Sequence, residues 1–178
     1  MQWLLEAITR LALPCLIGLL VAGRAIVLLV RWRLGRGLDR SWSWRSSVSE
    51  VGAVAGTLPW LVLLLTPTAG EGGLTLIPFR DLTALSTADA ATIAVQLVGN
   101  LLACAALGFF LPIRFRIGVG TVALVALALS TLVEITQYVL DLGRVTSVDD
   151  VIINTAGGTI AALLSRRWWR SRREAEGT

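Results

Sequence analysis

Histidine is absent from this sequence of 178 residues, and charged residues make up only 16% of it. The absence of histidine excludes a Ser-His-Asp or Cys-His nucleophile system and every zinc site that uses imidazole. The sequence also has no glycine-rich phosphate loop and no dinucleotide-binding fingerprint, so we predict neither a metal nor a cofactor. Any catalysis would therefore have to use carboxylates, arginine and hydroxyl groups.

Cysteine is scarce as well. Cys15 and Cys104 lie in different hydrophobic segments, at depths that we expect in opposite halves of a bilayer. A disulfide between them is not predicted, and we interpret both as small packing residues.

Hydrophobic residues, in contrast, make up 55% of the chain, and its mean hydropathy is +0.74. They occur in long runs, and a membrane-spanning helix needs roughly 20 predominantly apolar residues. We therefore predict an all-α, polytopic membrane helix bundle of about five transmembrane helices. The expected spans are residues 11–30, 51–66, 92–111, 117–140 and 151–165. The second and fifth are short, and we extend them back to about residues 48 and 148.

The arginines indicate an orientation for these spans. They gather in alternate segments, namely residues 31–45 after the first run, Arg114 and Arg116 between the third and fourth, and 166–173 in the tail. Because such segments stay in the cytoplasm, we expect the N-terminus outside and the C-terminus inside. The opposite loops, 67–91 and 141–150, carry only Arg80 and Arg144. A cleaved signal peptide is a less favoured alternative, because Glu6 and Arg10 make a poor n-region.

The net charge of +4 and the pI near 10.4 have a membrane explanation. Since the basic residues flank predicted spans, their expected partners are anionic lipid headgroups and not nucleic acid. Tryptophans at positions 32, 42, 44, 168 and 169 lie among them, as expected for an interfacial aromatic belt. We treat the chain as one transmembrane domain. It comprises the first two helices with their basic loop (1–66), a three-helix region (74–165) and a basic cytoplasmic tail (166–178).

Polar residues interrupt the last three runs in pairs. Such pairs share one helix face, because residues three or four apart are neighbours on a helix. The pairs are Gln96 with Asn100, Glu134 with Gln137, and Asp150 with Asn154. At a rise of about 1.5 Å per residue, Asn100, Glu134 and Asn154 lie roughly 6–14 Å inward from the outer ends of their helices. Three polar faces are thus predicted at one depth.

A charged side chain inside a bilayer costs at least about 2.5 kcal/mol, so Glu134 should face the bundle interior and either find a cation or stay protonated. Arg144, in the next turn, is the nearest candidate cation. We expect it to fold back over Glu134 and Asp150 in an outward-facing pocket that the loop 67–91 roofs. The alternative is that such residues only hold helices together, an interpretation we favour for Gln96 alone. Gly52 and Gly56, and Gly157 and Gly158, are interpreted as sites of close helix packing.

The C-terminal half resembles the VanZ-like family. The family's Glu-x-x-Gln, the arginine of the following turn and the Asp-x-x-x-Asn with glycine correspond to Glu134, Gln137, Arg144, Asp150, Asn154 and Gly157. The segment 76–80 and the pair Asn100 and Gly108 are similar to two further family motifs, and the resemblance covers roughly residues 74–165. Thr75, Ala106 and Ser147 depart from the pattern, the last where an acid often lies, although Asp149 can substitute for it.

The resemblance implies a multi-pass protein of the bacterial plasma membrane that is linked to glycopeptide resistance, specifically to teicoplanin. Our leading hypothesis is a pocket for the headgroup of an envelope lipid or cell-wall precursor, with Arg144 contacting phosphate. The expected ligand-binding residues are Asn100, Glu134, Gln137, Arg144, Asp150 and Asn154, supported by Arg80, Gln96, Asp149 and Gly157. Two alternatives are an intramembrane enzyme with Glu134 and Asp150 as an acid-base pair, and a structural assembly partner.

Overall fold

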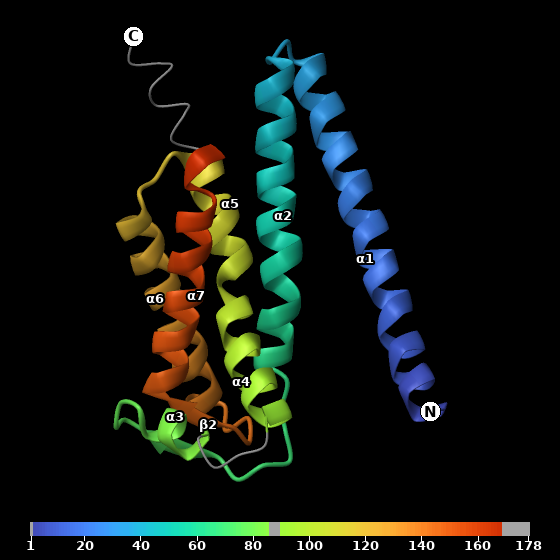
Figure 1. Ribbon diagram of the computed structural model, residues 1–178. Helices are drawn as coiled ribbons and strands as arrows, with labels where there is room; N and C mark the ends of the chain where they lie inside the picture. Colours follow the sequence, from blue (N-terminus) through green and yellow to red (C-terminus); the bar gives the residue numbers. More distant parts are fainter. Residues whose placement is uncertain (1, 86–89, 169–178) are drawn as a thin grey trace.

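The computed structural model describes residues 2–85 and 90–168, with side chains from residue 12 onward except at 82, 84, 85, 90–92, 94 and 95. Its elements are α1 (Gln2–Gly35), α2 (Arg40–Leu64), β1 (Gly73–Thr75), α3 (Arg80–Leu85), α4 (Ala90–Ala103), α5 (Ala105–Phe115), α6 (Val119–Val139), β2 (Val145–Ser147) and α7 (Val148–Leu164). Figure 1 shows the long helices side by side, with the two short strands and α3 at one end. The predicted all-α class is confirmed.

Four segments within these helices are long and apolar enough to cross a membrane. They are Ala12–Gly35, Arg40–Leu64, Gln96–Phe115 and Val119–Val139. The third combines α4 and α5, which follow one another with a break at Cys104. Helix α7 has 17 residues and is about 25 Å long, somewhat shorter than a hydrocarbon core of about 30 Å. It matches the fifth expected span in position, and its crossing of the membrane stays a prediction.

Helix α2 is longer than the sequence indicated, since it begins at Arg40 and not near residue 48. Asp39 caps its N-terminus by accepting hydrogen bonds from the Ser41 hydroxyl at 2.5 Å and the Trp42 amide at 2.9 Å. Both bonds lower the pKa of the Asp39 carboxyl, and the bond from Ser41 has the larger effect. Ser43 and Ser47, which lie before the expected start near residue 48, are fully buried in the helix packing.

Glycines bring the helices into close contact, as predicted. A Cβ atom on Gly56 would come within 2.4 Å of the Ala106 side chain, which joins α2 to α5. A Cβ atom on Gly157 would lie 2.0 Å from the carbonyl oxygen of Leu101. A Cβ atom on Gly108 would lie 2.0 Å from the carbonyl oxygen of Gly158. The backbone of α7 therefore packs directly against the backbones of α4 and α5. These contacts confirm the packing interpretation of the glycine pairs.

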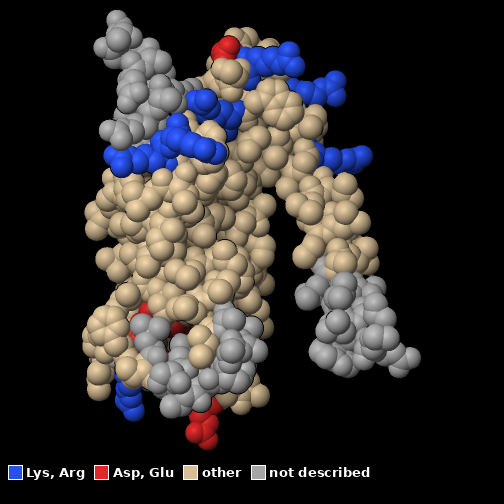
Figure 2. Space-filling model, viewed as in Figure 1, with Lys and Arg blue, Asp and Glu red and all other residues tan. Residues whose placement is uncertain are grey.

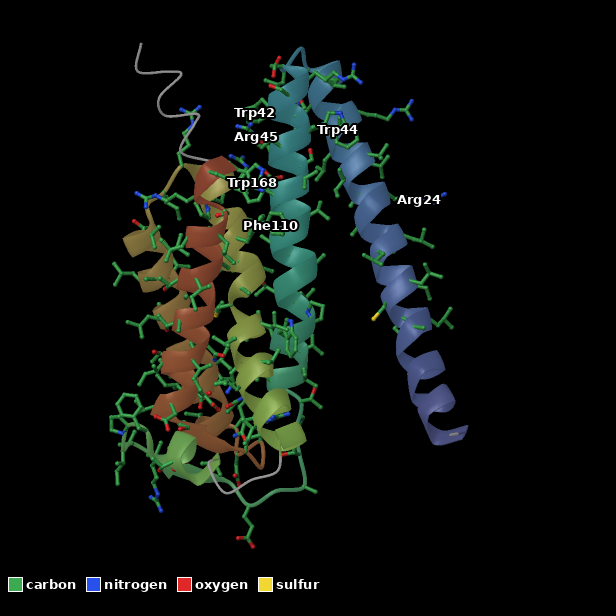
Figure 3. All side chains as sticks on the ribbon, in the orientation of Figure 1. Arg24, Trp42, Trp44, Arg45, Phe110 and Trp168 are labelled. Atoms are coloured by element: carbon green, nitrogen blue, oxygen red, sulfur yellow. The ribbon has the colours of Figure 1, made fainter. Side chains whose placement is uncertain are left out.

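Arginines gather at one end of the bundle, which we call the arginine end (Arg31, Arg33, Arg36, Arg40, Arg45, Arg114, Arg116, Arg166 and Arg167). Figure 2 shows this concentration clearly. Arg45, Trp42, Trp44 and Trp168 lie in the same region in Figure 3, whereas Trp169 and the rest of the tail lie outside the described residues. This separation fits the predicted orientation, which itself stays a prediction.

Helix α1 is tied to the bundle at the arginine end. Glu50 of α2 accepts from Arg33 of α1 at 2.6 Å and from Arg114 of α5 at 2.5 Å, and Arg33 also donates to Ser47 at 2.6 Å. Farther along, α1 leans away from the other helices (Figure 1). Arg24 projects from the side of α1 turned away from the bundle (Figure 3).

The other end, which we call the loop end, contains β1, α3 and β2. The strands pair in parallel, with Gly73 opposite Val145 and Thr75 opposite Ser147. Gly143 precedes β2 with φ +66°, and a Cβ atom there would lie 2.2 Å from the Thr68 carbonyl oxygen, so glycine is required. Residues 67–85, which belong to the expected roofing loop, are therefore folded beside the start of α7.

Candidate functional site

The polar residues predicted from the sequence all lie toward the loop end, but they form separate groups. Asn100 of α4 donates to the carboxylate of Asp150 in α7. Asn154, one turn farther along α7, donates to the Ser130 hydroxyl of α6 at 2.8 Å. Asn154 is 2% exposed, and among the described residues its Oδ1 has no hydrogen-bond partner. These two groups connect α4, α6 and α7.

Glu134 forms a different group with β2. Its Oε2 accepts the Ser147 amide at 2.9 Å, and its backbone carbonyl accepts the Thr146 hydroxyl at 3.3 Å. Ser147 also caps α7 by accepting from the Asp149 amide at 3.2 Å, and it donates its hydroxyl to Asp81. The serine that departs from the family pattern thus connects α6, α7 and the start of α3.

Asp149 holds the segment between α2 and α4 in place. It is 1% exposed, and its carboxylate accepts the amides of Phe79 at 2.5 Å and Asp81 at 2.9 Å. These two amides lie at the start of α3, where backbone donors have no partner inside the helix. Phe79 has φ 65°, an uncommon conformation for a residue other than glycine. Asp149 therefore fixes the roof of the loop end.

The predicted pairing of Arg144 with Glu134 is wrong. The Arg144 guanidinium donates to the carbonyl oxygens of Leu63 at 3.1 Å and Thr66 at 3.4 Å. Gln137 likewise donates to the Leu64 carbonyl at 2.8 Å. The last carbonyls of a helix can accept hydrogen bonds from outside the helix, and both side chains donate to the end of α2, where the positive charge of Arg144 is also favourable. Among the described residues, no arginine forms an ion pair with Glu134.

A cavity of about 190 Å³ lies beside Glu134. Four lining residues belong to one face of α6, and the others come from β1 and the residue that follows it, from β2 and from the start of α7. The lining comprises Leu74, Leu76, Thr131, Glu134, Ile135, Tyr138, Thr146, Ser147, Val148 and Val151. Glu134 is 5% exposed, whereas Tyr138 is 56% exposed and Leu76 is 65% exposed. The pocket therefore combines a buried carboxylate with apolar walls that continue onto the protein surface.

Of the predicted ligand-binding residues, only Glu134 lines this pocket. Asp150 does not, so the pocket does not hold an acid-base pair of Glu134 and Asp150. Gln96 and Arg80 are exposed, Gly157 is a packing residue, and the described residues contain no cluster of three or more potential metal ligands. The spacing of Thr131, Ile135 and Tyr138 around Glu134 could have revealed the α6 face from the sequence. Leu74 and Leu76 could not, because their position depends on the strand pairing.

These features define a polytopic helical membrane protein with a small amphipathic pocket at its loop end. The family model described as VanZ/LLP1 matches residues 26–170, and the chain belongs to this family. The match begins within α1, so it extends beyond the region 74–165 in which the sequence motifs were found. A search of the curated proteins and a search of the solved structures each found no match.

Proposed function

We propose that this protein binds part of an envelope lipid, or of a lipid-linked cell-wall precursor, in the pocket beside Glu134. The observation that carries the proposal is the combination of a carboxylate that is 5% exposed with walls of leucine, isoleucine and valine. A carboxylate in such surroundings is costly unless a ligand or neighbour compensates it. An amphipathic molecule meets both requirements, because its polar part contacts Glu134 and its apolar part contacts the walls.

The position of the pocket also supports a membrane ligand. Thr131, Ile135 and Tyr138 belong to the last turns of the apolar helix α6. Ile135 and Tyr138 are both more than half exposed, so the α6 side of the pocket continues onto a surface suited to lipid chains. At about 190 Å³ the pocket is smaller than the roughly 300–1,000 Å³ of a typical small-molecule site. It accommodates a headgroup or a short length of chain, and the rest of the ligand stays in the bilayer.

Filling the pocket provides a direct test. Val151→Phe places a larger side chain in the lining, whereas Ile152→Phe makes the same kind of change at a neighbouring exposed residue of α7. The purified full chain is titrated with envelope lipids, and bound lipid is measured by native mass spectrometry. We expect Val151→Phe to lower lipid binding at least about tenfold and Ile152→Phe to leave it unchanged. Equal binding by both variants would refute the proposal.

We extend the proposal to the plasma membrane of a bacterium and to the lowered teicoplanin sensitivity implied by the VanZ-like resemblance. If this pocket carries that effect, expression of the protein in a teicoplanin-sensitive bacterium should raise the inhibitory concentration. The variant Val151→Phe should lose the increase at equal protein abundance, and Ile152→Phe should keep it. A full increase with Val151→Phe would separate resistance from this pocket.

A further inference from the structure

Glu134 leaves the pocket with a carboxylate oxygen that can accept a hydrogen bond from a ligand. The Thr146 and Ser147 hydroxyls donate to the Glu134 carbonyl and the Asp81 carboxylate, so their protons are already used. Glu134 accepts one bond at Oε2 from the Ser147 amide, and its Oε1 forms no hydrogen bond with the described residues. The hydroxyls of Thr131 and Tyr138, which also line the pocket, can donate or accept, whereas the Glu134 oxygen requires a donor that a ligand can bring.

The charges around the pocket favour a cation. The carboxylates described at the loop end are Glu71, Asp81, Glu134, Asp141, Asp149 and Asp150, whereas its described arginines are Arg80 and Arg144. Neither arginine lines the pocket, and Arg144 is bonded to the carbonyls at the end of α2. A phosphate group in the pocket would lie against Glu134 with no basic side chain in the lining to pair with it.

From these observations we infer that the pocket selects a lipid headgroup that bears a primary amine. The inference rests on the function proposed above and names the ligand chemistry of the same site. A primary ammonium supplies three donors and a positive charge in direct contact with Glu134, a contact that none of the described arginines makes. The Thr131 hydroxyl, which also lines the pocket, can accept a second hydrogen bond from the ammonium. The phosphate of the same lipid remains outside, toward the exposed rim of the pocket.

The test compares three lipids with identical acyl chains. Phosphatidylethanolamine carries the primary amine, phosphatidylcholine keeps the charge without N–H donors, and phosphatidylglycerol has no cation. Each is titrated into the detergent-purified full chain, and its dissociation constant is measured by native mass spectrometry. We expect the wild type to bind phosphatidylethanolamine about tenfold more tightly than either of the others, as loss of a charge-assisted hydrogen bond predicts.

Variants connect this preference to Glu134. Glu134→Gln should lower affinity for phosphatidylethanolamine about tenfold and leave the affinities for the other two lipids unchanged. The matched control Glu71→Gln makes the same chemical change at an exposed residue of the loop end and should preserve the preference. Thr131→Val provides a milder second variant if Glu134→Gln does not fold, and it should reduce the preference about threefold.

The outcomes separate the two proposals. Equal affinity of the wild type for all three lipids overturns the amine preference. The proposed function survives that result if Val151→Phe still blocks binding. A preference unchanged in both Glu134→Gln and Thr131→Val also overturns the inference, because the selecting group would then lie elsewhere. If no lipid binds in a manner sensitive to Val151→Phe, both proposals fail.

Discussion

Replacing Asp149 with asparagine should release the segment that covers the loop end. The carboxylate accepts two amides, those of Phe79 and Asp81. The asparagine carbonyl can accept one of them, but its NH₂ group meets the other as a second donor. A hydrogen bond to a charged group contributes about 1.5–3 kcal/mol, and a buried donor without a partner costs a similar amount. We therefore expect Asp149→Asn to favour local opening by about 2–3 kcal/mol.

Hydrogen exchange of the backbone amides measures this opening directly. At about 1.4 kcal/mol per factor of ten, the amides of Phe79 and Asp81 should exchange about 30- to 150-fold faster, while amides in the middle of α6 keep their wild-type rates. Asp141→Asn is the control, because Asp141 is exposed at the same end and its φ of 46° suits asparagine. Unchanged exchange at positions 79 and 81 in a folded Asp149→Asn protein would refute this account of the loop end.

Three further predictions concern helix packing and orientation. Gly157→Ala should destabilise the protein by about 1–3 kcal/mol, because its Cβ atom would lie 2.0 Å from a backbone carbonyl of α4. The control Gly120→Ala adds its Cβ atom in open space and should not destabilise the protein. Thermal unfolding in detergent measures both variants. Glu50→Gln should lower the free energy of unfolding by about 2 kcal/mol in the same assay. This is less than the loss of a fully buried ion pair, because the Glu50 carboxylate is 30% exposed. The control Glu71→Gln should leave the free energy of unfolding unchanged. In a chain without its native cysteines, an impermeant thiol reagent applied to whole cells should label Glu71→Cys and not Arg36→Cys; the reverse pattern would invert the topology.

The helical class and the positions of most apolar spans could be predicted because they depend on local composition. The start of α2 could not, because serines look like loop residues in a hydropathy pattern and become helical here through a cap at Asp39 and burial against neighbouring helices. Glu50 was overlooked for a related reason. Its two arginine partners come from α1 and α5, and only the assembled helices bring them together.

At the loop end, the sequence located the polar residues correctly but did not reveal their partners. Equal depth suggested one shared pocket, yet Asn100 and Asn154 bond to neighbouring helices, while Arg144 turns to the end of α2. A carboxylate attracts an arginine in any simple charge argument. The competing attraction of bare helix carbonyls became visible only when the end of α2 was located beside β2. The pocket itself depends on the strand pairing, which joins residues about seventy positions apart.

The capping of α2 by Arg144 has a consequence for synthesis of the chain. Leu63 and Thr66 precede their arginine partner by 81 and 78 positions, and Leu64 precedes Gln137 by 73, so α2 is synthesised long before these side-chain donors. Until Gln137 and Arg144 have been synthesised, the C-terminal end of α2 depends on water for the bonds that these two side chains later donate. Nascent chains halted before residue 144 should therefore expose that end to protease, and chains that extend beyond α7 should protect it.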